Sequence, residues 1–274
     1  MVETSYQKFI TKVLESTSKI ATDNFGKVSG TTKPEDNNQV LTETDIEIGN
    51  FITHEVQQTF PTHNIIDEEA GVIDKDSSYT WIIDPIDGTS NFAQGVPLYG
   101  IMIGLLKGDV PIAGGVALPE FSEVYIAEKG GGAYCNDERI RVSGETRLLS
   151  TLIAYSIDGH PEHPELTKEE GRLFGEIALR VRSLRASNSV FDIAMVAKGK
   201  YGATLHQNTK VWDNVAPHII LEEAGALYTD FWGKPMDYSN AMRRSKENYS
   251  ICAAPPALHK QIQDIIHTQA KSGT

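Results

Sequence analysis

The residues best suited to chemistry lie between positions 81 and 92 of the 274-residue chain. An apolar run there leads into Asp84 and Asp87, which are followed by Gly88 and Thr89. Carboxylates bind hard cations such as magnesium, and free backbone N–H groups at the start of a helix bind phosphate oxygens. The stretch therefore predicts a site for a phosphate ester bridged to a metal ion. A plain turn explains these residues equally well when they are taken alone, because Asp-Pro and Asp-Gly pairs are common in turns.

The elements that must position this stretch are a strand and a helix. Residues 81–83 are bulky and largely β-branched, which predicts a buried strand. The proline after Asp84 predicts that the strand ends there, because proline donates no hydrogen bond to a sheet. Gly88 allows the backbone to turn closely, and Thr89 or Ser90 can then cap a helix.

Two further acids lie at the boundaries of predicted elements. Glu68 follows a short strand candidate at residues 63–66, so it can point toward a site beside Asp84. Asp213 lies at the start of a helix that ends near residue 225, and it caps that helix or nearly caps it. Acidic residues at such positions are often only solvated surface, so their positions alone assign them no chemistry.

Asp45 lies in the first turn of another predicted helix, with Thr44 and Glu47 as its expected capping box. The helix dipole favours a carboxylate in a first turn, so the position of Asp45 needs no chemistry to explain it. The preceding residues 27–39 are rich in Gly, Thr, Asn, Asp and Pro. They predict an exposed loop, which is either a flap over the site or, more simply, a connector.

Composition and charge describe an ordinary globular protein, with 40% hydrophobic and 23% charged residues. The formal net charge of −12 argues against a protein that binds nucleic-acid backbones, which needs a basic face. It allows a small phosphorylated substrate, because metal ions can supply local positive charge. The two cysteines, Cys135 and Cys252, are far apart, so neither a zinc ribbon nor a redox pair is expected. No membrane span or secretory signal is evident, and the expected compartment is the cytoplasm.

The pattern of elements predicts a mixed α/β fold. Strand-like runs alternate with turns between residues 99 and 142, which is typical of an antiparallel meander. From about residue 146 onward, strands and helices mix without strict alternation. We therefore expect an N-terminal α+β lobe at residues 1–145, with most of the acids, and a C-terminal α/β lobe at residues 146–274, with Asp213 and the substrate pocket.

Three separated motifs resemble those of the inositol monophosphatase family, in the same order and at similar spacing. They are Glu68-Glu69, the stretch from Asp84 to Phe92, and Trp212-Asp213. Residues 40–45 also resemble an early Leu-Val-Thr-x-x-Asp segment of that family, and the resemblance covers residues 4–267. It implies a layered α/β/α/β/α sandwich with mixed and antiparallel sheets. It further implies a homodimeric, magnesium-dependent and lithium-sensitive phosphomonoesterase.

The resemblance also implies roles for single residues. Two to three magnesium ions would be held by Glu68, Asp84, the carbonyl of Ile86, Asp87 and Asp213. The N–H groups of Gly88 and Thr89, next to Asp87, would bind the phosphate. Thr89 and Asp45 would orient the attacking water, with Glu68 close by as the third catalytic residue. Several acids at one point repel one another when ionised, which is consistent with a need for cations.

The substrate end of the predicted site departs from the family pattern. Ser187-Asn188-Ser189 stands where the family commonly has Gly-Ser/Thr-Ala, and His206 stands where inositol-specific members carry a glutamate. A histidine there can accept a different polyol, a second phosphate or an aromatic ring, unless it is a strand-end residue that faces away. Arg185 lies nearby in sequence and can meet an anionic group of the substrate.

These observations predict the hydrolysis of a phosphate monoester of a small polyol or sugar, similar to inositol 1-phosphate, by metal-activated water. One alternative is the same reaction on a sugar bisphosphate, on a nucleotide similar to 3′-phosphoadenosine 5′-phosphate, or on histidinol phosphate. Another is a non-catalytic, metal-binding regulatory protein. A two-carboxylate glycosidase is disfavoured, since its chemistry needs no phosphate site. The expected partner is a small phosphorylated substrate, with no nucleic acid and no membrane.

Overall fold

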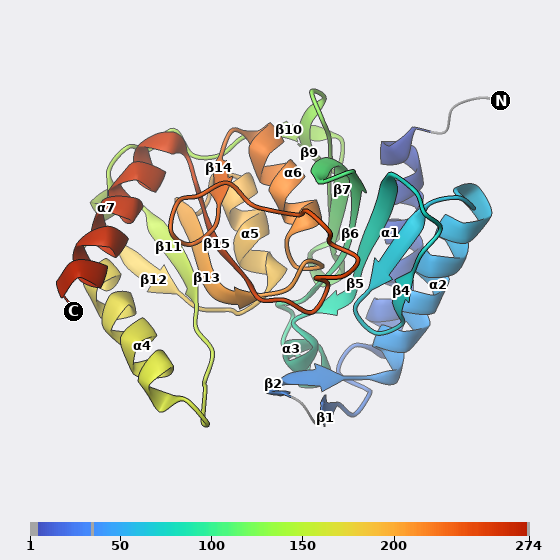
Figure 1. Ribbon diagram of the computed structural model, residues 1–274, viewed down its shortest axis with the longest axis horizontal. Helices are drawn as coiled ribbons and strands as arrows, with labels where there is room; N and C mark the ends of the chain where they lie inside the picture. Colours follow the sequence, from blue (N-terminus) through green and yellow to red (C-terminus); the bar gives the residue numbers. More distant parts are fainter. Residues whose placement is uncertain (1–4, 34–35, 273–274) are drawn as a thin grey trace.

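The computed structural model describes residues 5–33 and 36–272 (Figure 1). Its helices are α1 (Tyr6–Asn24), α2 (Glu43–Thr59), α3 (Thr89–Ala93), α4 (Pro164–Ala178), α5 (Val190–Ala197), α6 (Val215–Ala224) and α7 (Pro256–Ser272). Its strands are β1 (Thr31–Lys33), β2 (Asp36–Leu41), β3 (Asn64–Asp67), β4 (Gly71–Ile73), β5 (Tyr79–Asp87), β6 (Gly100–Lys107), β7 (Val110–Leu118), β8 (Glu123–Glu128), β9 (Gly132–Cys135), β10 (Glu138–Ile140), β11 (Leu152–Ser156), β12 (Ser183–Arg185), β13 (Ala203–Thr209), β14 (Leu227–Thr229) and β15 (Tyr249–Ala254).

These elements form five layers (Figure 1). Helices α1 and α2 cover one face of an eight-stranded sheet with the order β10-β9-β8-β7-β6-β5-β3-β4. Helices α5 and α6 lie between this sheet and a five-stranded sheet with the order β12-β11-β13-β15-β14. Helices α4 and α7 cover the far face of the second sheet. The predicted α/β/α/β/α sandwich with mixed and antiparallel sheets is therefore confirmed.

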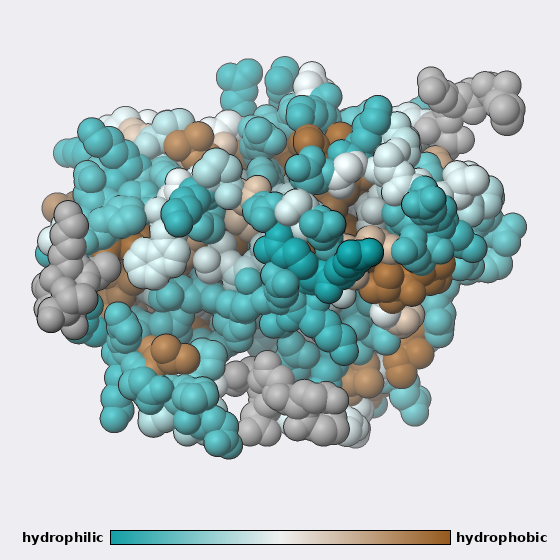
Figure 2. All heavy atoms as spheres, viewed as in Figure 1, coloured by the Kyte–Doolittle hydropathy of each residue, from teal (hydrophilic) through white to brown (hydrophobic). Residues whose placement is uncertain are grey.

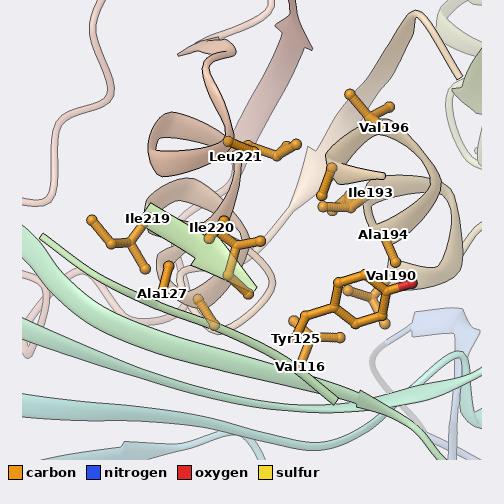
Figure 3. Packing of buried hydrophobic residues seen from close by; sticks show 14 of the residues in the cluster. Val116, Tyr125, Ala127, Val190, Ile193, Ala194, Val196, Ile219, Ile220 and Leu221 are labelled. Atoms are coloured by element: carbon orange, nitrogen blue, oxygen red, sulfur yellow. The ribbon is translucent and has the colours of Figure 1, made fainter. Parts of the chain in front are cut away.

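The middle layer joins the two sheets through a continuous apolar core. Figure 3 shows side chains of the large sheet facing those of the two central helices, including Val116, Tyr125, Val190, Ile193, Ile219 and Ile220. The cluster continues to Ile251 and Ala253 of β15, and both of these side chains are almost fully buried. Burial of this apolar surface from both sheets fixes the central helices between them.

Two predictions for the segment between residues 27 and 47 were wrong. The loop predicted at residues 27–39 contains an antiparallel hairpin of β1 and β2, because β-branched residues such as Thr32 and Val40 pair across it. The capping box of α2 is formed by Thr42 and Asp45, two residues earlier than predicted. The Thr42 hydroxyl accepts a hydrogen bond from the Asp45 N–H. In return, the Asp45 carboxylate accepts one from the Thr42 N–H at 2.9 Å. Helix α4 begins at Pro164, since proline is well suited to a first helical position.

The boundary between the two expected lobes falls between the two sheets in sequence. The last strand of the large sheet ends at Ile140, and the first strand of the small sheet begins at Leu152. The division at residue 145 stays a prediction. Within residues 5–33 and 36–272, no helix has the length and apolar character that a membrane crossing requires. The face seen in Figure 2 is largely hydrophilic, with its hydrophobic residues in scattered patches.

Candidate active site

Asp84 and Asp87 lie inside β5, so the prediction that the strand ends at Asp84 was wrong. In the pairing with β6, Asp84 lies opposite Met102 and Asp87 lies opposite Gly100. Three steps along β5 therefore match two along β6, which is a β-bulge. In a regular strand, residues three apart point to opposite faces. The extra residue lets both carboxylates face the same side, and the irregular pairing accommodates the proline between them.

Asp213 reaches the same place from the start of α6. Gly104 of β6 allows this helix to lie directly on the strand, because an added Cβ there would be 2.7 Å from the Val215 side chain. As a result, one carboxylate oxygen from each of Asp84, Asp87 and Asp213 lies within 4.8 Å of the other two. Packing of α6 on the large sheet therefore brings together acids that are far apart in sequence.

These three acids cannot all ionise without cost. Asp84 is buried, and its Oδ1 has no hydrogen-bond partner among the described residues. The pKa of Asp84 and that of Asp87 are raised well above the ordinary carboxyl range. Burial is the main cause, and the negative charges of neighbouring acids add to it. Burial also raises the pKa of Asp213. An unpartnered buried oxygen among crowded carboxylates fits the binding of divalent cations, which prefer oxygen ligands.

Glu68 lies beside this group because β3 and β5 are parallel, so their carboxyl ends meet at one edge of the sheet. The Glu68 N–H donates to the Ile83 carbonyl at 3.2 Å. Burial raises the pKa of Glu68 to about 8, with the charge of Asp213 adding to the rise and that of Lys33 opposing it. The Lys33 Nζ lies 2.8 Å from Glu68 Oε1 and 2.7 Å from Glu69 Oε1.

The turn after the bulge carries Gly88 and Thr89. Gly88 has φ of 78°, and an added Cβ would lie 2.9 Å from the Leu98 carbonyl oxygen, so no other residue fits without a shift. The Thr89 Oγ lies 3.0 Å from Asp45 Oδ1 and 2.8 Å from the Ile86 carbonyl. When Asp45 is ionised, both neighbours are acceptors. The single hydroxyl proton of Thr89 is then engaged, and its lone pairs remain available to accept from a water.

A cavity of about 340 Å³ opens over these groups. Most of the predicted site residues line it: Glu68, Asp84, Ile86, Asp87, Gly88, Thr89, Ser187, Asn188, Ser189, His206 and Asp213. Asp45 is buried and joins the site through Thr89. Arg185 does not line this cavity. It is exposed at the end of β12, where its guanidinium donates to Ser183 and to the Leu184 carbonyl.

One side of the cavity is organised around Asp158. The Asp158 Oδ2 lies 3.0 Å from His206 Nε2 and accepts from the Asn208 amide at 3.2 Å, while Oδ1 accepts from the Asn188 amide at 3.1 Å. Burial opposes ionisation of Asp158, but the hydrogen bonds from His206 and Asn208 hold its pKa below the usual range. His206 therefore lines the cavity, and three polar side chains, two from β13 and one from the segment before α5, converge on one carboxylate.

Sequence reasoning missed Lys33, Asp158 and Asn208. Asp158 follows β11, which runs parallel to β13, and Ser156 pairs with His206. An acid just beyond the end of a neighbouring parallel strand was a usable signal. Lys33 offered none, because its segment resembled a plain loop in composition.

Comparison with known proteins agrees with this geometry. The model of a family described as the inositol monophosphatase family matches residues 3–271. A protein of Aquifex aeolicus named fructose-1,6-bisphosphatase/inositol-1-monophosphatase is 32% identical over 83% of this chain and 86% of its own length. A putative Nus factor SuhB of Neisseria meningitidis is 34% identical over 84% of this chain and 85% of its own length. The solved structure of a Thermotoga maritima IMPase matches with a TM-score of 0.84 and 27% identity, and covers 97% of this chain and 98% of that one.

Proposed function

The chain belongs to the inositol monophosphatase family of phosphoric monoester hydrolases, and we propose that it hydrolyses a phosphate monoester of a small polyol or sugar, similar to inositol 1-phosphate, in a magnesium-dependent reaction. One observation carries the proposal: the oxygens of Asp84, Asp87 and Asp213 lie within 4.8 Å of one another beside the Gly88 turn. Crowded carboxylates suit hard cations, and the amides of the turn suit the phosphoryl group of an ester bound to those cations.

The ion ligands in this proposal are Glu68, Asp84, the carbonyl of Ile86, Asp87 and Asp213, for two to three magnesium ions. Bound there, magnesium would activate a water molecule and stabilise the leaving oxygen of an in-line displacement. The N–H groups of Gly88 and Thr89 would donate to the phosphoryl oxygens.

Thr89 has a positioning role in this proposal. Its hydroxyl proton is directed to Asp45 or to the Ile86 carbonyl, at 3.0 and 2.8 Å. A water next to Thr89 can therefore donate a hydrogen bond to the hydroxyl oxygen, which leaves a water lone pair free to face phosphorus. Glu68 lines the same cavity, and in this proposal it takes part in moving the proton.

The charge of the cavity supports an uncharged alcohol as the rest of the substrate. Among the described residues that line the cavity there is no lysine or arginine, and His206 is paired with Asp158. A second phosphate would meet no unpaired cationic side chain there. The hydroxyls of a polyol would find donors and acceptors in Asn188, Asn208 and the Asp158–His206 pair.

A second candidate substrate is a sugar bisphosphate, because the name of the Aquifex aeolicus relative includes fructose-1,6-bisphosphatase. The same reaction on a nucleotide or on histidinol phosphate has no comparable support. We further propose a homodimer and inhibition by lithium, on the family resemblance, and a cytoplasmic location, on the cysteine content of the sequence. Light scattering coupled to size-exclusion chromatography tests the dimer, and a lithium titration of the hydrolysis tests the inhibition.

Phosphate release from a panel of esters tests the function directly. The panel contains inositol 1-phosphate, fructose 1,6-bisphosphate, histidinol phosphate and p-nitrophenyl phosphate, each with magnesium and with EDTA. We expect hydrolysis only with the metal, and the highest kcat/KM for the polyol monophosphate. Hydrolysis that persists in EDTA would refute the metal role, and a preference for the bisphosphate would identify the second candidate as the substrate.

A further inference from the structure

Among the described residues, Lys33 is the one lysine or arginine that forms an ion pair with Glu68 or Glu69 at the site. It reaches them from the β1–β2 hairpin, and its Nζ lies 2.8 Å from Glu68 Oε1 and 2.7 Å from Glu69 Oε1. The three side chains are only 16%, 15% and 12% exposed. An ion pair of this kind is little screened by solvent, in contrast to the Lys12–Glu55 pair, whose lysine side chain is 71% exposed.

The formal charges of the site assign a role to this lysine. Glu68, Asp84, Asp87 and Asp213 carry four negative charges when ionised, which two divalent ions would neutralise. Glu69 would then remain as the partner of Lys33. In the structure the Lys33 ammonium donates to both Glu68 and Glu69. An ion that binds at Glu68 must therefore take over an oxygen that the Lys33 ammonium now contacts.

We propose that Lys33 is an internal cation that competes with the divalent ion at Glu68 and moves onto Glu69 when that ion binds. The proposal rests on the assignment of Glu68 as a metal ligand in the proposed function. Lys33 would stabilise the metal-free protein, because it neutralises carboxylates that are otherwise crowded and partly buried. By the same contact it would weaken the binding of the ion that shares Glu68.

A different role for Lys33 would be direct binding of the substrate phosphate. The two roles predict opposite results for metal binding. Removal of a competing cation strengthens the binding of the divalent ion. Removal of a phosphate ligand leaves the metal affinity unchanged and raises KM for the ester.

The test is isothermal titration of the full chain with magnesium and with manganese in the absence of substrate, at an alkaline pH that favours ionised carboxylates. Lys33→Met should bind the weakest of the measured ions about three- to tenfold more tightly than the wild type, because it lacks the competing charge. Lys33→Gln provides a second neutral side chain if the methionine variant folds poorly, and Lys33→Arg should bind like the wild type. Lys12→Met is the matched control, since it removes a lysine from an exposed ion pair and should change nothing.

Thermal unfolding gives a second measurement that requires no activity. In EDTA, Lys33→Met should unfold at a lower temperature than the wild type, and magnesium should raise its midpoint by more. An unchanged or weakened metal affinity in both neutral variants would overturn the proposal, and a raised KM in the same variants would identify Lys33 as a phosphate ligand. A protein that shows the binding shift but hydrolyses no ester would refute the proposed function and leave the role of Lys33 intact.

Discussion

Asp84→Asn should stabilise the metal-free protein while it abolishes hydrolysis. Oxygens of Asp84, Asp87 and Asp213 lie within 4.8 Å of one another, and at that distance each ionised pair repels by about 3 kcal/mol at an effective dielectric constant near 20. The acids avoid part of this repulsion by remaining protonated, as their raised pKa values indicate. We therefore expect a gain of about 2 kcal/mol from the neutral amide, which corresponds to a rise of about 4 to 8 °C in Tm.

The assay is thermal unfolding of the wild type and Asp84→Asn at one neutral pH, first in EDTA and then in magnesium, with phosphate release measured in parallel. In EDTA the variant should unfold at the higher temperature. Magnesium should stabilise the wild type more than the variant, and hydrolysis by the variant should fall by about a thousandfold or more, because an ion ligand is lost. Asp237→Asn is the control for the change in net charge. Asp237 is exposed and pairs with Arg244 at 2.8 Å, so its loss should not raise Tm.

The same reasoning fixes the pH dependence of the metal-free protein. The pKa of Glu68 is raised from 4.5 to about 8, so between these values the folded protein binds a proton that the unfolded chain releases. Stability in EDTA should therefore fall as pH rises through this window, and magnesium should oppose the fall. A metal-free protein that gains stability between these pH values would contradict the electrostatic argument. So would an Asp84→Asn protein that is less stable than the wild type in EDTA, or one that remains fully active with magnesium.

Three further changes test the other parts of the site. Thr89→Ala should lower kcat by about a hundredfold or more with a smaller effect on KM, whereas Thr89→Ser should retain most of the activity; equal rates for both variants in steady-state kinetics would exclude the hydroxyl from catalysis. Gly88→Ala should lower the free energy of unfolding in denaturant by about 1 to 3 kcal/mol, because an alanine there combines positive φ with a Cβ 2.9 Å from the Leu98 carbonyl oxygen. A variant as stable as the wild type would show that the turn relaxes freely. His206→Glu should shift preference toward inositol 1-phosphate, and an unchanged ranking of the ester panel would exclude His206 from substrate choice.

Much of the layered fold follows from local patterns. The antiparallel meander predicted between residues 99 and 142 is present as β6 to β10, as its alternating runs and turns indicate. Two of the wrong predictions share a physical cause. Tertiary pairing overrode local signals where β6 keeps β5 in the sheet past Pro85, and where β1 and β2 pair within a loop-like segment.

The site itself was less accessible to sequence reasoning than the fold. The approach of Asp213 to Asp84 depends on where α6 lies on the large sheet. Gly104 permits the close packing of α6 on β6, but its role is evident only once the two elements are known to pack together. Arg185 illustrates the opposite error. It is close to the pocket residues in sequence, but its strand lies at the edge of the small sheet and its side chain is exposed. Closeness in sequence was therefore a poor guide at the substrate end.

The rigidity of its supports holds the acidic cluster together. Asp84 follows Ile82 and Ile83, both almost fully buried, and Asp213 precedes Val215, whose side chain is buried against β6. Moving either carboxylate away would pull apolar side chains out of the core, at a cost of about 1.5 to 3 kcal/mol for each large side chain exposed. That cost is comparable to the repulsion between one ionised pair. The acids therefore remain close together, and they relieve the repulsion by binding protons or cations rather than by moving apart.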